Sequence, residues 1–167
     1  MNNLLRKLSI VFFIATIFIS CEKEVGPLSD FKPVVPVTVS NATAFRPDPT
    51  VSTSISGGGA IQIVLNIPAN SGRTIKEITK IAASTSYAAV QGIGTGIIYY
   101  TSAPIAGSGV SVTFTTSLTQ YFTIHPVSTA NPAAKADTEL ARRFYFLITL
   151  DDNSVIVSEP VRVLVLS

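Results

Sequence analysis

Two stretches of the chain repeat strongly apolar side chains at every second position, and this pattern most limits the folds open to it. The positions are Ile61, Ile63, Leu65 and Ile67 in one stretch and Phe144, Phe146, Ile148 and Leu150 in the other. Successive side chains of a β-strand point to opposite faces, so a period of two predicts strands with one apolar face. We therefore expect a chain built from half-buried β-strands.

The clearest hairpin lies at the end of the sequence. Residues 151–154 (Asp-Asp-Asn-Ser) favour a turn after the strand 144–150, and the chain then returns through 155–158 and 161–166. Pro160 has no N–H to donate to a neighbouring strand, so it marks a bulge or an edge position in this last strand.

The remaining elements are predicted from shorter signals. Strands are expected to start near Val37 and to occupy 97–101, 110–116 and 121–125, with turns at 57–59 and 68–72. Asn131 followed by Pro132 is typical of a helix N-terminus, which predicts one short helix within 131–143.

Residues 74–84 fit two structures. Ile75, Ile78 and Ile81 recur every three residues, which is typical of a helix. The β-branched residues and the flanking turns instead favour a strand that contains a bulge, and this is the prediction that we adopt.

About seven short strands separated by turns every 8–12 residues predict an all-β sandwich over 37–167. The segments 61–67, 143–150 and 155–166 resemble an antiparallel immunoglobulin-like or fibronectin-III-like sandwich, although the two cysteines and the tryptophan of antibody domains are absent. A transthyretin-like sandwich would produce a similar pattern.

The N-terminus has the composition of a secretory signal peptide. Arg6 and Lys7 precede the apolar run 8–19, and the small residue Ser20 follows it. A membrane-spanning helix needs about 20 apolar residues. The run is shorter than that, so we predict a signal peptide over 1–20 rather than an anchor helix.

The single cysteine, Cys21, lies directly after this predicted signal peptide. Ile19, Ser20 and Cys21 resemble the lipobox of bacterial lipoprotein precursors, and the charged residues 22–24 resemble those of surface lipoproteins in the Bacteroidota. The resemblance implies cleavage between Ser20 and Cys21, lipidation of Cys21, and a location at the outer membrane or cell surface. Residues 21–36 contain three prolines and no strand period, which predicts an extended tether.

Charge and cysteine content exclude several function classes. The whole chain carries a formal net charge of +2, but both excess charges belong to the predicted signal peptide. The predicted mature protein is therefore neutral, and composition offers no support for nucleic-acid binding. One cysteine excludes an internal disulfide and a multi-cysteine zinc cluster, and one histidine excludes a site built on several histidines.

No segment has the spacing of a catalytic, cofactor or metal site. His125 is expected at a strand end with no chemical role, and Asp151 and Asp152 are explained by the turn. The glycine-rich segment 92–96 lacks the ending of a phosphate loop. Arg142, Arg143 and Arg162 are interpreted as a solvated face. We predict no enzyme activity, no cofactor and no metal.

Two adjacent tyrosines and one asparagine are the remaining candidate binding or modification residues. Tyr99 and Tyr100 are adjacent, so one ring is expected in the core and the other at the surface, where a ring can stack on a sugar. The glycosylation-type tripeptide that begins at Asn41 is interpreted as a chance match.

Three hypotheses for function follow. The first is a lipid-anchored, non-catalytic module that binds envelope proteins or glycans. The second is a fimbria-like subunit that assembles by addition of its apolar C-terminal strand, 161–166. The third, a hydrolase, has no residue spacing in its favour.

Overall fold

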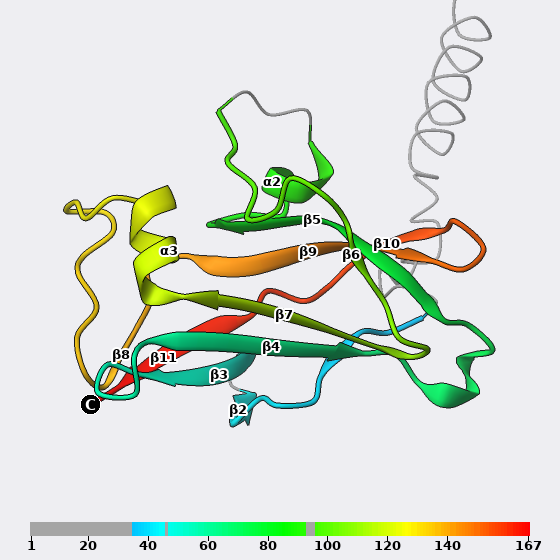
Figure 1. The fold of residues 1–167 in the computed structure, drawn as a ribbon, viewed down its shortest axis with the longest axis horizontal. Helices are drawn as coiled ribbons and strands as arrows, with labels where there is room; N and C mark the ends of the chain where they lie inside the picture. Colours follow the sequence, from blue (N-terminus) through cyan, green and yellow to red (C-terminus); the bar gives the residue numbers. More distant parts are fainter. Residues whose placement is uncertain (1–34, 46, 93–95) are drawn as a thin grey trace, which may run out of the picture. The chain divides into compact units, whose positions relative to one another are not determined.

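The predicted all-β sandwich is confirmed by the computed structural model of the chain, which describes residues 35–45, 47–92 and 96–167. Figure 1 shows β-strands packed over a shared interior, with short helices at the margins. The predicted signal peptide, the lipidation of Cys21, the tether up to residue 34 and part of the glycine-rich segment 92–96 lie outside the described residues.

The strands are β1 (Thr38–Val39), β2 (Ala44–Phe45), β3 (Pro49–Ser54), β4 (Ala60–Asn66), β5 (Ile75–Ser84), β6 (Ile105–Ala106), β7 (Ser111–Ser117), β8 (Thr138–Glu139), β9 (Arg143–Leu150), β10 (Val155–Val157) and β11 (Arg162–Leu166). The helices are the 3₁₀ turn η1 (Ala69–Ser71), α2 (Ala88–Gln91) and α3 (Leu118–Ile124). Seven strands of the described residues are three or more residues long, as expected from the sequence.

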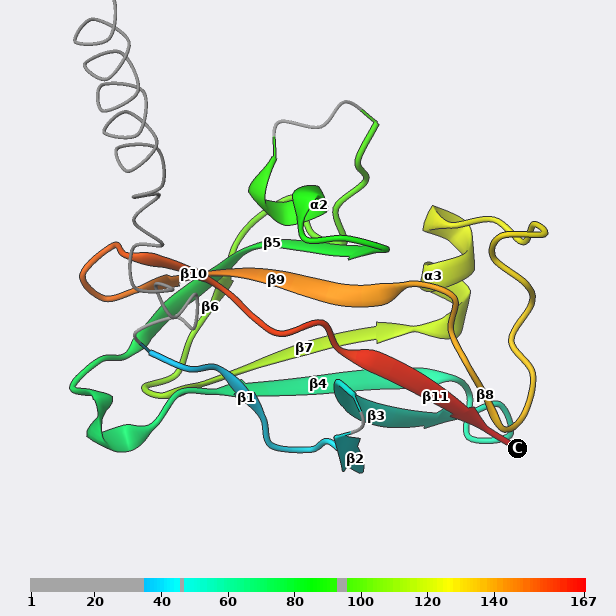
Figure 2. The same cartoon turned by 180° about the vertical axis from the view of Figure 1, so that it is seen from behind.

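The strands divide as in an immunoglobulin-like sandwich. One sheet has the order β1-β4-β7, and the other elements form the sheets β10-β9-β5-β6 and β2-β3-β11-β8. A bridge between Phe144 and Val161 links the last two sheets. Strands β4 and β7 therefore pair apart from β5, β9 and β10, which is how strands B and E separate from C, F and G in that fold. The pairs are antiparallel apart from β3 and β11, which run parallel (Figure 2).

The core is built from the alternating faces of these strands. The apolar positions of β4 and β9 that were identified in the sequence are fully buried. Phe114 of β7 reaches across to β9, with its ring centroid 5.7 Å from that of Phe144 and 5.6 Å from that of Phe146. Such aromatic pairs add to the free energy gained by burying apolar surface, so they tie the two layers together.

The bulged strand is confirmed, and the terminal hairpin is confirmed for its return through 155–157. The rest of the predicted return is wrong, because β11 pairs with β3 and β8 in another sheet. In the hairpin, Val155 pairs with Thr149 and Ile156 with Ile148. Pro160 falls in the break between β10 and β11, as predicted for a residue without an N–H donor. The segment 74–84 is the strand β5, and its register with β9 shifts at two places near its N-terminal end.

The predicted strand 121–125 is wrong, because this segment belongs to helix α3. Ser117 has an extended backbone (φ −144°), and its Oγ accepts a hydrogen bond of 3.1 Å from the backbone N–H of Gln120. This N-cap satisfies one free N–H of the first turn and starts a helix directly at the end of β7. Helix α3 lies at the end of the sandwich that also holds the C-terminus (Figures 1 and 2).

The predicted helix within 131–143 is also wrong. The side chain of Asn131 does not cap a helix, because it is 2% exposed and bonds to Tyr121 and His125. Asp137 has a left-handed backbone (φ 59°), which interrupts a right-handed helix. The segment contributes only the short strand β8.

The predicted strand 97–101 is wrong as well. In the described residues of this segment, the backbone N–H of Tyr100 donates to the carbonyl of Ile81 at 3.0 Å, and no ladder continues from it. The segment instead crosses the end of β5 as an irregular loop.

Candidate functional site

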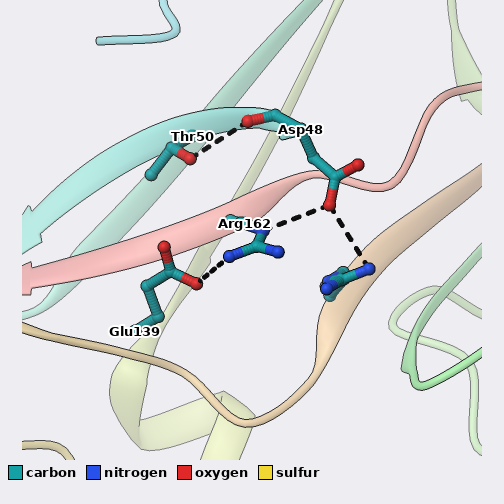
Figure 3. Close-up of polar contacts among 5 residues, drawn as sticks. Asp48, Thr50, Glu139 and Arg162 are labelled. Atoms are coloured by element: carbon teal, nitrogen blue, oxygen red, sulfur yellow. Dashed lines mark hydrogen bonds and ion pairs between the residues drawn. The ribbon is translucent and has the colours of Figure 1, made fainter. Parts of the chain in front are cut away.

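The three arginines that were interpreted as one solvated face belong to two different environments. Arg143 and Arg162 both contact the carboxylate of Asp48, at 3.3 Å and 3.1 Å. Arg162 also contacts Glu139 at 2.7 Å, as Figure 3 shows. The hydrogen bond to Asp48 is the main cause of the raised pKa of Arg162.

This ion network is a structural connection rather than a ligand site. Asp48 directly precedes β3, its two arginine partners lie on β9 and β11, and Arg162 pairs in turn with Glu139 on β8. The network therefore connects the start of β3 with three other strands of the linked sheets. Thr50 adds a hydrogen bond from its hydroxyl to the carbonyl of Asp48 (Figure 3). The carboxylates inside the network neutralise both arginines.

Asp151 and Asp152 of the hairpin turn bind to neighbouring protein groups. Asp151 accepts a hydrogen bond from the backbone N–H of Thr74. Asp152 pairs with Arg73 at 2.7 Å, and hydrogen bonds from Ser154 are the main cause of its lowered pKa. In the described part of the chain, no group of three or more His, Cys, Asp or Glu side chains is placed to hold a metal ion.

Neither tyrosine of the predicted pair presents an open ring face. Tyr100 is 7% exposed and packs 5.1 Å from Phe144, measured between ring centroids, so it is the core member of the pair. Tyr99 is half-buried; its hydroxyl donates to the carbonyl of Ala89, and the Lys80 ammonium lies 5.6 Å from its ring centroid. The arrangement gives little support to sugar stacking on Tyr99.

Asn41 has a structural role. Its amide Nδ2 donates to the carbonyl of Gln62 at 2.8 Å, and its Oδ1 accepts from the N–H of Val64 at 2.9 Å. The side chain therefore continues the β1–β4 ladder beyond the end of β1.

A pocket of about 200 Å³ lies where β5 ends, α3 ends and β9 begins. We call it the His125–Arg142 pocket. Its lining residues are Ala83, Ser84, Ala89, Gly96, Ile97, Ile98, Ile124, His125 and Arg142. Helix α2, which packs on the outer face of β5 and β9 through Ala89 and Val90, supplies one wall.

Three buried polar atoms at this end of the sandwich have no hydrogen-bond partner among the described residues. They are the Nε2 of His125, the Nε of Arg142 and the hydroxyl oxygen of Tyr100. The first two residues line the pocket, and the Tyr100 ring lies 6.3 Å from the His125 ring. Buried polar atoms are normally paired with protein groups or with ordered water, so these three mark the polar part of this end of the sandwich.

One hydrogen-bond network holds His125 and Arg142, two of the polar residues of the pocket. The Tyr121 hydroxyl accepts from the backbone N–H of Arg142 at 3.2 Å and donates to the Oδ1 of Asn131 at 2.8 Å. Asn131 in turn donates from its Nδ2 to the carbonyl of His125 at 2.6 Å. The backbones of His125 and Arg142 are therefore positioned by a buried frame, which we call the Tyr121–Asn131 frame.

The electrostatics of the pocket are simple. Burial, followed by the nearby Arg142 charge, lowers the pKa of His125, so its ring is neutral at pH 7. Burial also raises the pKa of Tyr100, which keeps the phenol protonated. Arg142 is the only charged residue of the lining, and no carboxylate among the described residues forms an ion pair with it.

The pocket therefore combines polar and apolar groups. It presents one permanent cation and two neutral polar side chains, those of His125 and Ser84, beside the side chains of three isoleucines. His125 and Arg142 are each recognisable in the sequence, but their proximity is not. The prediction treated Arg142 and Arg143 as parts of one solvated face. In the structure Arg143 contacts Asp48, whereas Arg142 lines the pocket.

Neither a protein-family model nor a curated protein matches this chain. Among the described residues, no helix is both long enough and apolar enough to cross a membrane.

Proposed function

We propose that the chain is a lipid-anchored lipoprotein of the bacterial outer membrane or cell surface, and that its β-sandwich is a non-catalytic binding module with the His125–Arg142 pocket as its ligand site. The anchor part of this proposal is supported by the lipobox-like residues that end at Cys21. Two or three acyl chains on that cysteine would hold a folded domain at a membrane, because each buried CH₂ contributes about 0.8 kcal/mol.

The observation that carries the binding part is the single pocket that His125 and Arg142 line together. His125 and Arg142 line the pocket and are held by the Tyr121–Asn131 frame, yet their side-chain nitrogens lack partners among the described residues. A site that is held in position before its ligand arrives loses less entropy on binding. The pocket and the frame together support a binding role for this end of the sandwich. Glycans or envelope proteins are the expected sources of the ligand.

The alternative, assembly by donation of the C-terminal strand, is less well supported. Strand β11 pairs with β3 over five residues on one side and with β8 on the other. Its Val163 and Val165 are fully buried in the core. Donation would therefore require breaking two ladders and exposing part of the core.

Two variants with matched exposure test the proposed pocket. Ile98 at the pocket is 56% exposed, and Val127 outside its lining is 58% exposed, so a larger side chain is tolerated at both positions. We expect Ile98→Trp to obstruct the pocket and to abolish binding when the full chain in detergent is screened against sugars, sugar acids and envelope extracts. Val127→Trp is expected to bind as the unmodified protein does. Equal binding by both variants would reject the pocket as the ligand site.

The anchor is tested separately by growing cells with labelled palmitate. We expect label on the unmodified protein and none on Cys21→Ala. Label that persists on the variant would contradict lipidation at this residue.

A further inference from the structure

We infer that the His125–Arg142 pocket binds a carboxylate group of a small organic acid, with Arg142 as its ionic partner. This inference rests on the proposed binding function and names the chemical class of the ligand.

The charge of the pocket calls for an anion. Among the described ranges, Arg73, Arg143 and Arg162 each contact a carboxylate, whereas Arg142 has no such contact. The lining contains no acidic side chain that could serve as its counter-ion. Arg142 therefore brings to the pocket a charge that no described carboxylate balances, and an anionic ligand would balance it.

The hydrogen-bonding groups call for an acceptor. The guanidinium of Arg142 can only donate, and the neutral ring of His125 and the hydroxyl of Ser84 can each donate as well. An ionised carboxylate is acceptor-only and forms short, charge-assisted bonds with a guanidinium. A neutral sugar hydroxyl could use the same donors but would leave the charge of Arg142 uncompensated.

The number of charges favours a monoanion. Arg142 supplies one positive charge, and His125 adds none at neutral pH because burial lowers its pKa. A carboxylate balances this single charge, whereas a phosphate monoester carries up to two negative charges. A carboxylate therefore fits the pocket better than a phosphate.

The size and walls of the pocket limit the rest of the ligand. A volume of about 200 Å³ lies below the range of roughly 300–1,000 Å³ that is typical of sites for drug-sized molecules. Ile97, Ile98 and Ile124 provide apolar walls beside the polar end. The pocket therefore suits one small unit, such as a single sugar acid or the carboxylate end of a chain.

Matched probes separate this inference from the proposed function. D-Glucuronate and D-glucose share a ring and differ at one carbon, which is a carboxylate in the first and a hydroxymethyl group in the second. Glucose 6-phosphate carries a phosphate at the same carbon, and acetate is a minimal carboxylate. Binding of each probe to the full chain in detergent is measured by ligand-observed NMR.

We expect the unmodified protein to bind glucuronate at least tenfold more tightly than glucose or glucose 6-phosphate, and to bind acetate weakly. Arg142→Gln is expected to weaken glucuronate binding about 10- to 100-fold, which is the usual effect of losing a hydrogen bond to a charged group. Arg142→Lys, which keeps the charge, should retain part of the affinity. Arg143→Gln is the matched control, since it removes the neighbouring charge outside the pocket and should leave the affinity unchanged.

Each contrary result has a distinct meaning. If glucose binds as well as glucuronate and Ile98→Trp abolishes both, the binding function stands and the carboxylate inference is overturned. Tighter binding of glucose 6-phosphate also overturns it, in favour of a phosphate ligand. If neither carboxylate binds, or if the two arginine variants behave alike, the inference is rejected. Thermal unfolding of each variant checks that the loss of binding is not a loss of fold.

Discussion

Replacing Tyr121 with phenylalanine removes one oxygen atom from the frame that positions the pocket. Tyr121 is 0% exposed, and its hydroxyl bonds to the backbone N–H of Arg142 and to the Oδ1 of Asn131. Phenylalanine keeps the ring packing, including the edge-to-face contact with Phe122 at 5.0 Å. The variant therefore isolates the contribution of the Tyr121 hydroxyl to the free energy of unfolding.

The expected cost follows from the two groups that lose their partner. An unpaired buried donor or acceptor costs about 1–3 kcal/mol. Asn131 is almost fully buried, whereas Arg142 is half-buried and can regain part of its hydrogen bonding from water. We expect Tyr121→Phe to lower the free energy of unfolding by about 2–4 kcal/mol.

Urea unfolding followed by circular dichroism measures this cost. The midpoint should fall by about 1–2 M with an unchanged slope, because the surface exposed on unfolding stays the same. Tyr99→Phe is the control, since its hydroxyl makes one hydrogen bond at a half-buried position and should cost about 1 kcal/mol or less. If the two variants are destabilised equally, or if Tyr121→Phe costs less than about 0.5 kcal/mol, the frame does not have the role assigned to it.

Three further perturbations have defined outcomes. Gly107→Ala should lower the melting temperature by about 10 °C, because the added Cβ would collide with the carbonyl of Ile75. Asp48→Asn should cost about 1–3 kcal/mol in urea unfolding, less in high salt, because Arg162 loses a charged partner. Stability should also fall as the pH drops below 6.5: the folded pKa of His125 is lowered, so the unfolded state binds more protons there, and the contribution is present above 6.5 and lost below it.

Each of these has its own control. Gly57→Ala places a Cβ 3.3 Å from the Cβ of Ser54, a side chain that can adjust, so it should change the melting temperature far less than Gly107→Ala. Asp152→Asn removes an exposed ion pair and should matter less than Asp48→Asn. His125→Gln should flatten the stability profile between pH 7 and pH 5, and an unchanged slope in that variant would contradict the assignment to His125.

The strands that were predicted correctly are those with a local apolar pattern. In β4 and β9 the side chains that repeat every two residues are the ones that the core buries, so the sequence alone locates them. Strand β3 was not predicted, because Val51 is its only large apolar side chain. Its buried Thr50 and Thr53 acquire their environment from the parallel pairing with β11, which lies more than 100 residues away along the chain.

Helix α3 shows how two local signals compete. The β-branched and aromatic residues of 121–125 favour a strand, and this composition decided the prediction. Ser117 and Gln120 have the S-x-x-Q spacing of a helix start, and the Oγ of Ser117 does cap the helix. Giving that capping signal more weight would have found the helix.

The pocket was beyond prediction from sequence for a different reason. His125 and Arg142 are separated by 17 positions, and the contacts that bring them together pass through Tyr121 and Asn131. Asn131 was assigned to a helix cap because its sequence context favours one. Its actual partners are tertiary, and no local pattern specifies them.

The central claim, a ligand site between α3, β5 and β9, is tested most directly by mapping backbone and side-chain NMR shifts of the isotope-labelled protein during a titration with glucuronate. The structure predicts shifts at 83–84, 97–98 and 124–125 and at the Nε–H of Arg142, with little change at the Asp48 ion network. Shifts that instead cluster on another face, such as around Tyr87, or a spectrum that does not respond would contradict the claim.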